Sequence, residues 1–171
     1  MHAIRTALAA AILVALALPA SAQAPAGPAL IAQYGDWGVY VSQAARTKIC
    51  YALSQPKERL PAALKRDPGY FFVSTRPGEN VKNEVSIIAG FKIKDASDAI
   101  ADIGGTAFTL YTKTDSAWVR NVAEEARLVD ALRRGRDLTV KSTSARGNAT
   151  TDKYSLTGFA QALDRVAQEC R

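Results

Sequence analysis

The sequence predicts an all-β protein, an antiparallel β-sandwich with one short internal helix and a C-terminal helix. Two observations predict this class. Short runs of β-branched and aromatic residues recur between turn signals from residue 37 to residue 156. These runs do not alternate regularly with helical patterns, as the strands of a parallel α/β sheet would.

Eight candidate strands account for most of this region. In the candidate strand 47–54, successive side chains point to opposite faces, with Ile49, Tyr51 and Leu53 on one face and Cys50 on the other. If the first face lies in the core, Cys50 points to the outer face of the sheet. The run 70–73 is apolar on both sides, which predicts a central strand covered on both faces. The eight strands are 37–42, 47–54, 70–76, 84–90, 107–112, 117–120, 138–144 and 151–156.

Two helices are predicted from their end signals and their periodicity. Asn121 can cap the first helix, because Glu124 follows at capping-box spacing and Gly135 stands just beyond the last turn. The second helix covers 158–170 and carries along one side an apolar stripe that includes Cys170. The other members of that stripe are Phe159, Leu163, Val166 and Ala167.

The N-terminal residues 1–22 are predicted to be a secretory signal peptide. A short basic start precedes an apolar run, and Ala20 and Ala22 form an A-x-A cleavage site. The apolar run is shorter than the roughly 20 residues that a transmembrane helix needs. Residues 23–33 are rich in Ala, Pro and Gly, which predicts a disordered leader, and 34–171 are expected to form a single β-sandwich domain.

Cleavage after Ala22 changes what the composition allows. It removes His2, the only histidine, and the loss of Arg5 lowers the net charge from +6 to +5. A mature chain without histidine excludes Ser-His-Asp and Cys-His catalysis, histidine proton shuttles and His-ligated zinc.

The two cysteines, Cys50 and Cys170, both remain in the mature chain. An even pair in an exported protein indicates a disulfide, since the compartment is oxidising. Two free thiols are the alternative. A bridge would link the C-terminal helix to an early strand and leave neither thiol as a nucleophile or a metal ligand.

Two kinds of histidine-independent hydrolase stay open as alternatives. One would use a serine with a desolvated lysine, and Lys141, Ser142 and Ser144 are the candidates. Strand alternation places Lys141 on the face opposite the two serines. The other would use paired carboxylates, although helix-dipole stabilisation already explains Glu124 and Glu125. The sequence contains no phosphate-loop motif, so no cofactor is predicted. No catalytic residue or metal site is predicted either.

Basic residues are distributed unevenly along the chain. Six basic residues and one acidic residue lie between Arg46 and Arg66, and a second group predicts a surface for an anionic partner. An ordinary solvated face is the alternative. Nucleic acid is not expected, because the chain is exported and has no basic-aromatic binding motif. The second group comprises Arg127, Arg133, Arg134, Arg136, Lys141, Arg146 and Lys153.

An ordered series of segments resembles the invasion-associated locus B family of alphaproteobacterial exported proteins. The series runs through 34–40, 48–52, 70–77, 83–86, 128–135, 143–147 and 151–156. The resemblance implies an immunoglobulin-like β-sandwich in the periplasm or the envelope, and it brings no catalytic motif. The family name comes from a role in host-cell entry.

These observations together predict a non-enzymatic exported protein located in the periplasm or associated with the envelope; association with the outer membrane and secretion are the alternatives. We expect a binding or envelope-maintenance module whose partner is a protein or an anionic component of the envelope or a host surface. No cofactor is expected. Besides the hydrolases, a chaperone-like periplasmic protein with an exposed strand edge remains an alternative.

Overall fold

The computed structural model describes residues 27–44 and 47–171. Eleven strands form one continuous sheet, in the order β1-β2-β3-β5-β6-β9-β8-β7-β10-β11-β4, and all neighbouring strands are antiparallel. The strands are β1 Ala29–Tyr34, β2 Trp37–Ala44, β3 Thr47–Ser54, β4 Glu58–Leu60, β5 Tyr70–Arg76, β6 Val81–Ile88, β7 Asp98–Ile103, β8 Thr106–Lys113, β9 Ser116–Val119, β10 Asp137–Thr143 and β11 Ala149–Ser155. The helices are α1 Val122–Arg134 and α2 Phe159–Glu169, and a short 3-10 turn covers Pro77–Glu79.

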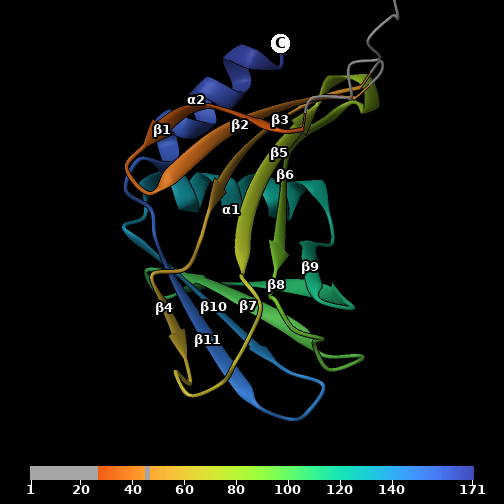
Figure 1. The fold of residues 1–171 in the computed structure, drawn as a ribbon, viewed down its shortest axis with the longest axis vertical. Coiled ribbons are helices and arrows are strands. Elements are labelled where there is room, and N and C mark those ends of the chain that lie inside the picture. Colours follow the sequence, from red (N-terminus) through yellow and green to blue (C-terminus); the bar gives the residue numbers. More distant parts are fainter. Residues whose placement is uncertain (1–26, 45–46) are drawn as a thin grey trace, which may run out of the picture.

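The sheet bends into two halves that enclose one hydrophobic core (Figure 1). One half contains β1, β2, β3, β5 and β6, the other contains β7, β8, β10, β11 and β4, and β9 connects them by pairing with β6 and β8. Contacts cross between them: the rings of Phe71 and Tyr154 are 5.8 Å apart, and the indole nitrogen of Trp37 donates to the Ser155 carbonyl at 3.0 Å. The predicted antiparallel sandwich is therefore confirmed, and a single bent sheet builds it.

Three strands were not predicted. All eight predicted strands are present, and β1, β4 and β7 join them. In β7, the buried residues Ala99, Ala101 and Ile103 alternate with exposed or half-buried ones. Alanine and aspartate have low strand propensity, so β7 forms because its small residues fit the core and not because of its composition.

The strand β1 corrects the disordered leader that was expected over 23–33. Ala29–Tyr34 pairs with β2. Without it, β2 would be an unpaired edge of the sheet, to which a segment of mixed polar and apolar residues can add. The leader prediction is thus wrong from Ala29 onward. The predicted signal peptide and residues 23–26 lie outside the described residues.

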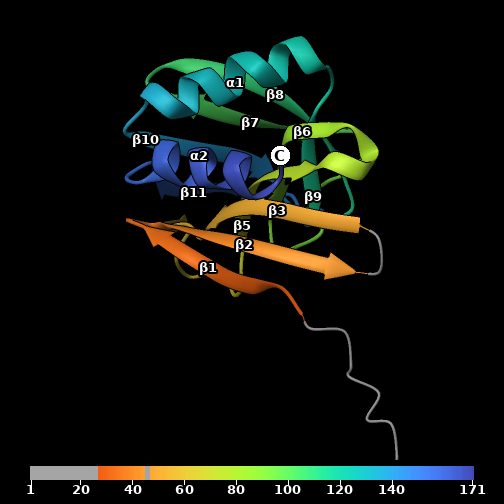
Figure 2. The same ribbon diagram turned by 90° about the horizontal axis from the view of Figure 1, so that it is seen from above.

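Both helices lie where they were predicted, on the same side of β1, β2 and β3 (Figure 2). The Asn121 side chain accepts a hydrogen bond from the Glu124 amide at 2.8 Å, and Gly135 ends α1. Within residues 27–44 and 47–171, neither helix is long and apolar enough to cross a membrane.

The helix α2 packs on the core face of β3, not on its outer face. Cys50 and Ala52 are fully buried, whereas Ile49, Tyr51 and Leu53 are half-buried on the other side of the strand. The predicted face assignment was therefore wrong. The physical reason is space: the small Cys50 and Ala52 side chains leave room for a helix, and the Tyr51 hydroxyl can stay in water on the outer face.

The same reason corrects the expectation for residues 70–73. Phe71 and Val73 are fully buried, but Tyr70 and Phe72 are half-buried on the outer face. No helix in the described part of the chain packs on this face, since both helices occupy the inner side. The second apolar face of β5 is therefore partly open to solvent.

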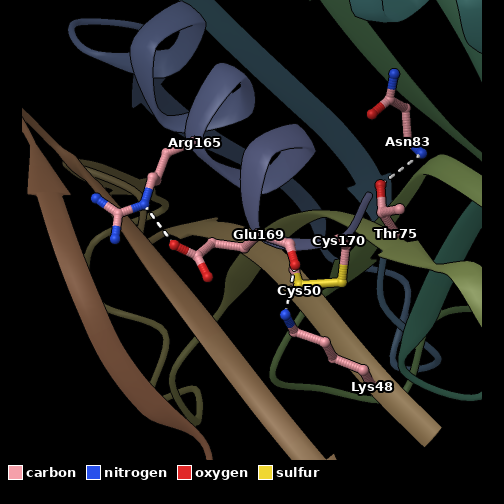
Figure 3. The surroundings of a disulfide bond; sticks show 7 residues. All are labelled: Lys48, Cys50, Thr75, Asn83, Arg165, Glu169 and Cys170. Atoms are coloured by element: carbon pink, nitrogen blue, oxygen red, sulfur yellow. Dashed lines mark hydrogen bonds and ion pairs between the residues drawn. A yellow bond between two sulfur atoms is a disulfide. The ribbon is translucent and has the colours of Figure 1, made fainter.

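The predicted bridge between Cys50 and Cys170 is confirmed (Figure 3). Their Cα atoms are 5.9 Å apart, and the bridge closes a loop of 120 residues. Lys48 reaches over the bridge to donate to the Glu169 carbonyl, and Arg165 forms an ion pair with the Glu169 carboxylate at 2.8 Å. The end of α2 is thus held on β3 by covalent and polar contacts.

We expect the bridge to contribute about 4 kcal/mol to the free energy of unfolding, because it restricts a long loop in the unfolded chain. Urea unfolding of the oxidised protein with and without reductant measures this loss. The chain has only two cysteines, so a Cys50→Ala/Cys170→Ala variant should be as unstable as the reduced protein and should not respond to reductant. An oxidised wild type whose free energy of unfolding does not change on reduction would contradict the assignment.

We expect the stability of the α1–β6 contact to depend on pH through Glu125. This half-buried carboxylate accepts a hydrogen bond from the Val85 amide at 2.7 Å. Burial raises the pKa of Glu125 above its ordinary value of 4.5, and the Glu84 carboxylate adds to the effect. The carboxyl group of Glu125 binds its proton more tightly in the folded state than in the unfolded state. Its contribution to the free energy of unfolding is therefore fully present below pH 4.5 and is lost as pH rises through the folded-state pKa.

Urea unfolding at a pH below 4.5 and at neutral pH tests this expectation. Relative to the wild type, Glu125→Gln should gain stability as pH rises, because the amide keeps an acceptor for Val85 and carries no charge. Glu124→Gln, a change to the neighbouring carboxylate at the start of α1, is the matched control and should keep the wild-type pH dependence. A Glu125→Gln variant that loses stability at neutral pH would contradict the assignment.

Candidate functional site

A basic cleft of about 440 Å³ lies where three loops meet. The loops join β4 to β5, β6 to β7, and β10 to β11. Five charged residues line the cleft, of which Asp67 is the one carboxylate. The other four are the cations Lys65, Arg66, Lys92 and Arg146. The cleft therefore has the charge to attract an anion.

Backbone hydrogen bonds fix the three loops to one another. The Asp67 amide donates to the Gly90 carbonyl at 3.0 Å, and the Ala145 amide donates to the Lys92 carbonyl at 2.8 Å. Gly90 has a φ of 72°, and a Cβ atom there would lie 2.1 Å from the Asp67 carbonyl oxygen. Only glycine permits this approach, so the walls of the cleft are held in place without a ligand.

Arg66, which lines the cleft, belongs to a buried ion-pair network that lies behind it. Asp152 of β11 accepts from Arg66 at 2.8 Å and from Arg59 at 3.3 Å, and the Asp152 and Arg66 side chains are only 8% and 5% exposed. Arg59 also donates to the carbonyls of Asp67 at 2.6 Å and Ala89 at 2.7 Å, which ties two of the loops together. Two guanidinium groups meet one carboxylate, so the network keeps a net positive charge.

Aromatic rings border this network. The Arg66 guanidinium lies 5.9 Å from the centroid of the Phe91 ring, a cation–π distance. On the core side, burial raises the pKa of the Tyr154 hydroxyl, and the Asp152 carboxylate raises it further. Tyr154 therefore stays protonated, and the network carries no negative charge besides that of Asp152.

The seven basic residues predicted to form one anion-binding surface are all exposed but do not gather at one place. Arg146 lines the cleft, whereas Arg127 and Arg134 line a separate hollow of about 200 Å³ between α1 and β8. Arg133 forms an ion pair with Asp164 at 2.9 Å. Lys153 forms one with Glu58 at 2.7 Å.

The remaining two residues of that group, Arg136 and Lys141, lie apart from the cleft. Lys141 stands on the outer face of β10, opposite Thr151. Three cleft cations, Lys65, Arg66 and Lys92, are outside the predicted group, because they come from loops distant in the sequence. The sequence did contain one indication of these cations, the excess of basic residues between Arg46 and Arg66. That segment includes Lys65 and Arg66 but not Lys92.

A family model described as "Invasion associated locus B (IalB) protein" matches residues 73–167. The chain belongs to this family. The resemblance predicted from the sequence is thus confirmed. The match runs from β5 to α2 and includes the β6–β7 and β10–β11 walls of the cleft, but not the β4–β5 loop.

A solved structure supports the same fold. The crystal structure of invasion associated protein B from Bartonella henselae has a TM-score of 0.60 and 17% sequence identity, over 82% of this IalB-family chain and 98% of that chain. At this identity the likeness concerns the fold. No curated protein sequence matches the chain.

The structure does not assemble the groups that the two hydrolase alternatives require. Ser142 shares a hydrogen bond with the Thr150 hydroxyl at 2.9 Å, Ser144 accepts from the Asn148 amide at 3.1 Å, and Lys141 is exposed on the opposite face. Glu124 and Glu125 bond to different partners, Asn121 and Val85. Within the described ranges, no group of three His, Cys, Asp or Glu side chains could hold a metal ion.

We expect Asp152→Asn to lower the free energy of unfolding by about 3–5 kcal/mol, because it leaves the buried Arg66 charge without its carboxylate. Thermal and urea unfolding measure the change. Glu58→Gln is the matched control: its pair with Lys153 joins the same strands but is about half exposed, so about 0.5 kcal/mol or less should be lost. Equal losses in the two variants would contradict a structural role for the network.

Proposed function

We propose that this IalB-family protein is an exported, non-enzymatic binding protein of the bacterial envelope that holds an anionic group in the basic cleft. One observation carries the proposal. Lys65, Lys92 and Arg146 come from three loops that are hydrogen-bonded to one another, and they line the cleft together with Arg66, whose ion-pair network keeps a net positive charge. Cations converging on a preformed hollow favour an anionic ligand more than scattered surface charge does.

Two further features support the location in the periplasm or at the envelope. The sequence predicts a signal peptide, and the chain holds a disulfide between its only two cysteines. Disulfides persist in oxidising compartments, of which the bacterial periplasm is one. The anionic partner in this location would be a phosphorylated or carboxylated envelope component, an acidic glycan, or the surface of a host cell.

A chaperone-like interaction role is the second candidate, and one observation favours it. β1 is an edge strand of the sheet, and its Leu30 side chain is 55% exposed. An edge strand can add a strand from another chain. This role needs main-chain pairing at β1 and does not need the basic cleft, so variants in the cleft distinguish the two candidates.

We expect a Lys65→Gln/Lys92→Gln/Arg146→Gln variant to bind lipopolysaccharide at least about tenfold more weakly than the wild type at low salt. Isothermal titration with purified lipopolysaccharide measures the affinity. The wild-type affinity should fall as salt is added, because the cleft cations lie close to solvent and are screened.

The matched control is Arg127→Gln/Arg134→Gln/Arg136→Gln. It removes the same number of positive charges from exposed positions outside the cleft, so its affinity should stay close to that of the wild type. Equal losses in the two triple variants would indicate an effect of net charge alone. Absence of binding by the wild type at low salt would contradict the proposal.

A further inference from the structure

The outer face of the sheet carries a band of aromatic side chains that the core does not use. Six half-buried aromatic residues lie on this face, four on β2, β3 and β5 and two on β9 and β8, with β6 between the two groups. Their chain neighbours, such as Val39, Phe71 and Ala117, point inward and are fully buried. The six are Tyr40, Tyr51, Tyr70, Phe72, Tyr111 and Trp118. Both helices lie on the inner side, so neither helix covers this band (Figure 2).

Part of this band forms the floor of a groove of about 680 Å³. The rings of Tyr40 and Tyr51 are stacked with centroids 5.3 Å apart, the rings of Tyr51 and Phe72 are 5.8 Å apart, and those of Phe72 and Tyr70 are 5.9 Å apart. The four rings therefore make a continuous row across three hydrogen-bonded strands. We call this hollow the aromatic groove.

Gly38 gives the row its shape at one end. A Cβ atom on Gly38 would lie 2.8 Å from Cε2 of Tyr40, so the Tyr40 ring leans over the space where a side chain would stand. An aromatic ring that covers a glycine in a neighbouring position lies over the sheet instead of standing away from it. The ring then adds to the floor of the groove.

The rim of the aromatic groove is polar but electrically balanced. The exposed amides of Gln33 and Gln55 line it, together with an ion pair between Asp36 and Lys57. Hydrogen bonds from Lys57 and Ser155 lower the pKa of Asp36, so its carboxylate stays charged and balances the lysine. The groove thus offers aromatic surface and hydrogen-bonding groups without a net charge, in contrast to the basic cleft.

We infer that the aromatic groove binds an uncharged oligosaccharide. A pyranose ring has an apolar face of C–H groups, which packs on the electron-rich face of an aromatic ring, and a rim of hydroxyls, which bond to amides and carboxylates. The volume lies in the range of ligand sites that combine an aromatic lining with a few polar groups. A neutral lining favours a neutral ligand.

The groove is less suited to an apolar protein segment. Of the large hydrophobic side chains that are most exposed in the described part of the chain, Leu60 and Val122 lie away from the groove, and only Leu30 borders it, beside Gly38 at one end. This second site goes beyond the anion-binding function and does not depend on it, since the two hollows share no lining residue.

Titration of the isotope-labelled chain, without its predicted signal peptide, with chitohexaose, cellohexaose and maltohexaose tests the inference. At least one of these neutral hexasaccharides should shift the backbone amide resonances of β2, β3 and β5, in a saturable manner and independently of salt. Tyr40→Ala and Tyr70→Ala should each weaken binding about tenfold. Tyr111→Ala removes an aromatic ring from the same face outside the groove, and it should bind like the wild type.

Circular dichroism and thermal unfolding establish that each variant is folded. Tyr51→Phe, which keeps the ring and removes only the hydroxyl, is a milder substitution in the same row than replacement by alanine. The cleft variant Lys65→Gln/Lys92→Gln/Arg146→Gln should bind the oligosaccharide normally, which separates this inference from the proposed anion site. The inference is overturned if no hexasaccharide shifts these resonances at millimolar concentration, or if Tyr111→Ala weakens binding as much as Tyr40→Ala. It is also overturned if an unfolded polypeptide probe shifts them and the sugars do not.

Discussion

The placement of α2 on the concave side of the sheet is the constraint on which the rest of the structure depends. The Cys50–Cys170 bridge fastens the end of the helix to β3. Fully buried Cys50 and Ala52 leave the space that the helix fills, and Phe159 at its start packs against Trp37 with ring centroids 4.8 Å apart. The helix packs on the buried residues of this side, so the alternate residues of β2, β3 and β5, among them Tyr40, Tyr51 and Phe72, lie on the outer face.

This arrangement gives the molecule two hollows with different chemistry. The basic cleft is made by loops and is lined mainly by cations, whereas the aromatic groove is made by strands and has a neutral rim. Backbone hydrogen bonds between the loops hold the cleft, and sheet hydrogen bonds hold the groove. Neither hollow requires a ligand to keep its walls in place, so little ordering entropy would oppose binding at either one.

Local signals in the sequence predicted the secondary structure well where the interacting groups are only a few residues apart in the chain. Asn121 caps α1 through a hydrogen bond to Glu124, three residues along the chain, so the helix could be placed from the sequence. β7 was missed, because its alanines become strand residues only when a core excludes larger side chains. β1 was missed because its own composition does not indicate a strand. It becomes a strand by pairing with β2.

The sequence by itself determined the family, the antiparallel β class, both helices and the pairing of the two cysteines, since each depends on local pattern or on residue count. Only the tertiary structure decided which face of β3 and β5 is buried and which cations meet in one cleft. Strand alternation defines two faces but cannot tell which one a helix will cover. Likewise, Lys65, Lys92 and Arg146 are distant along the chain, and only the folding of three loops onto one another brings their charges together.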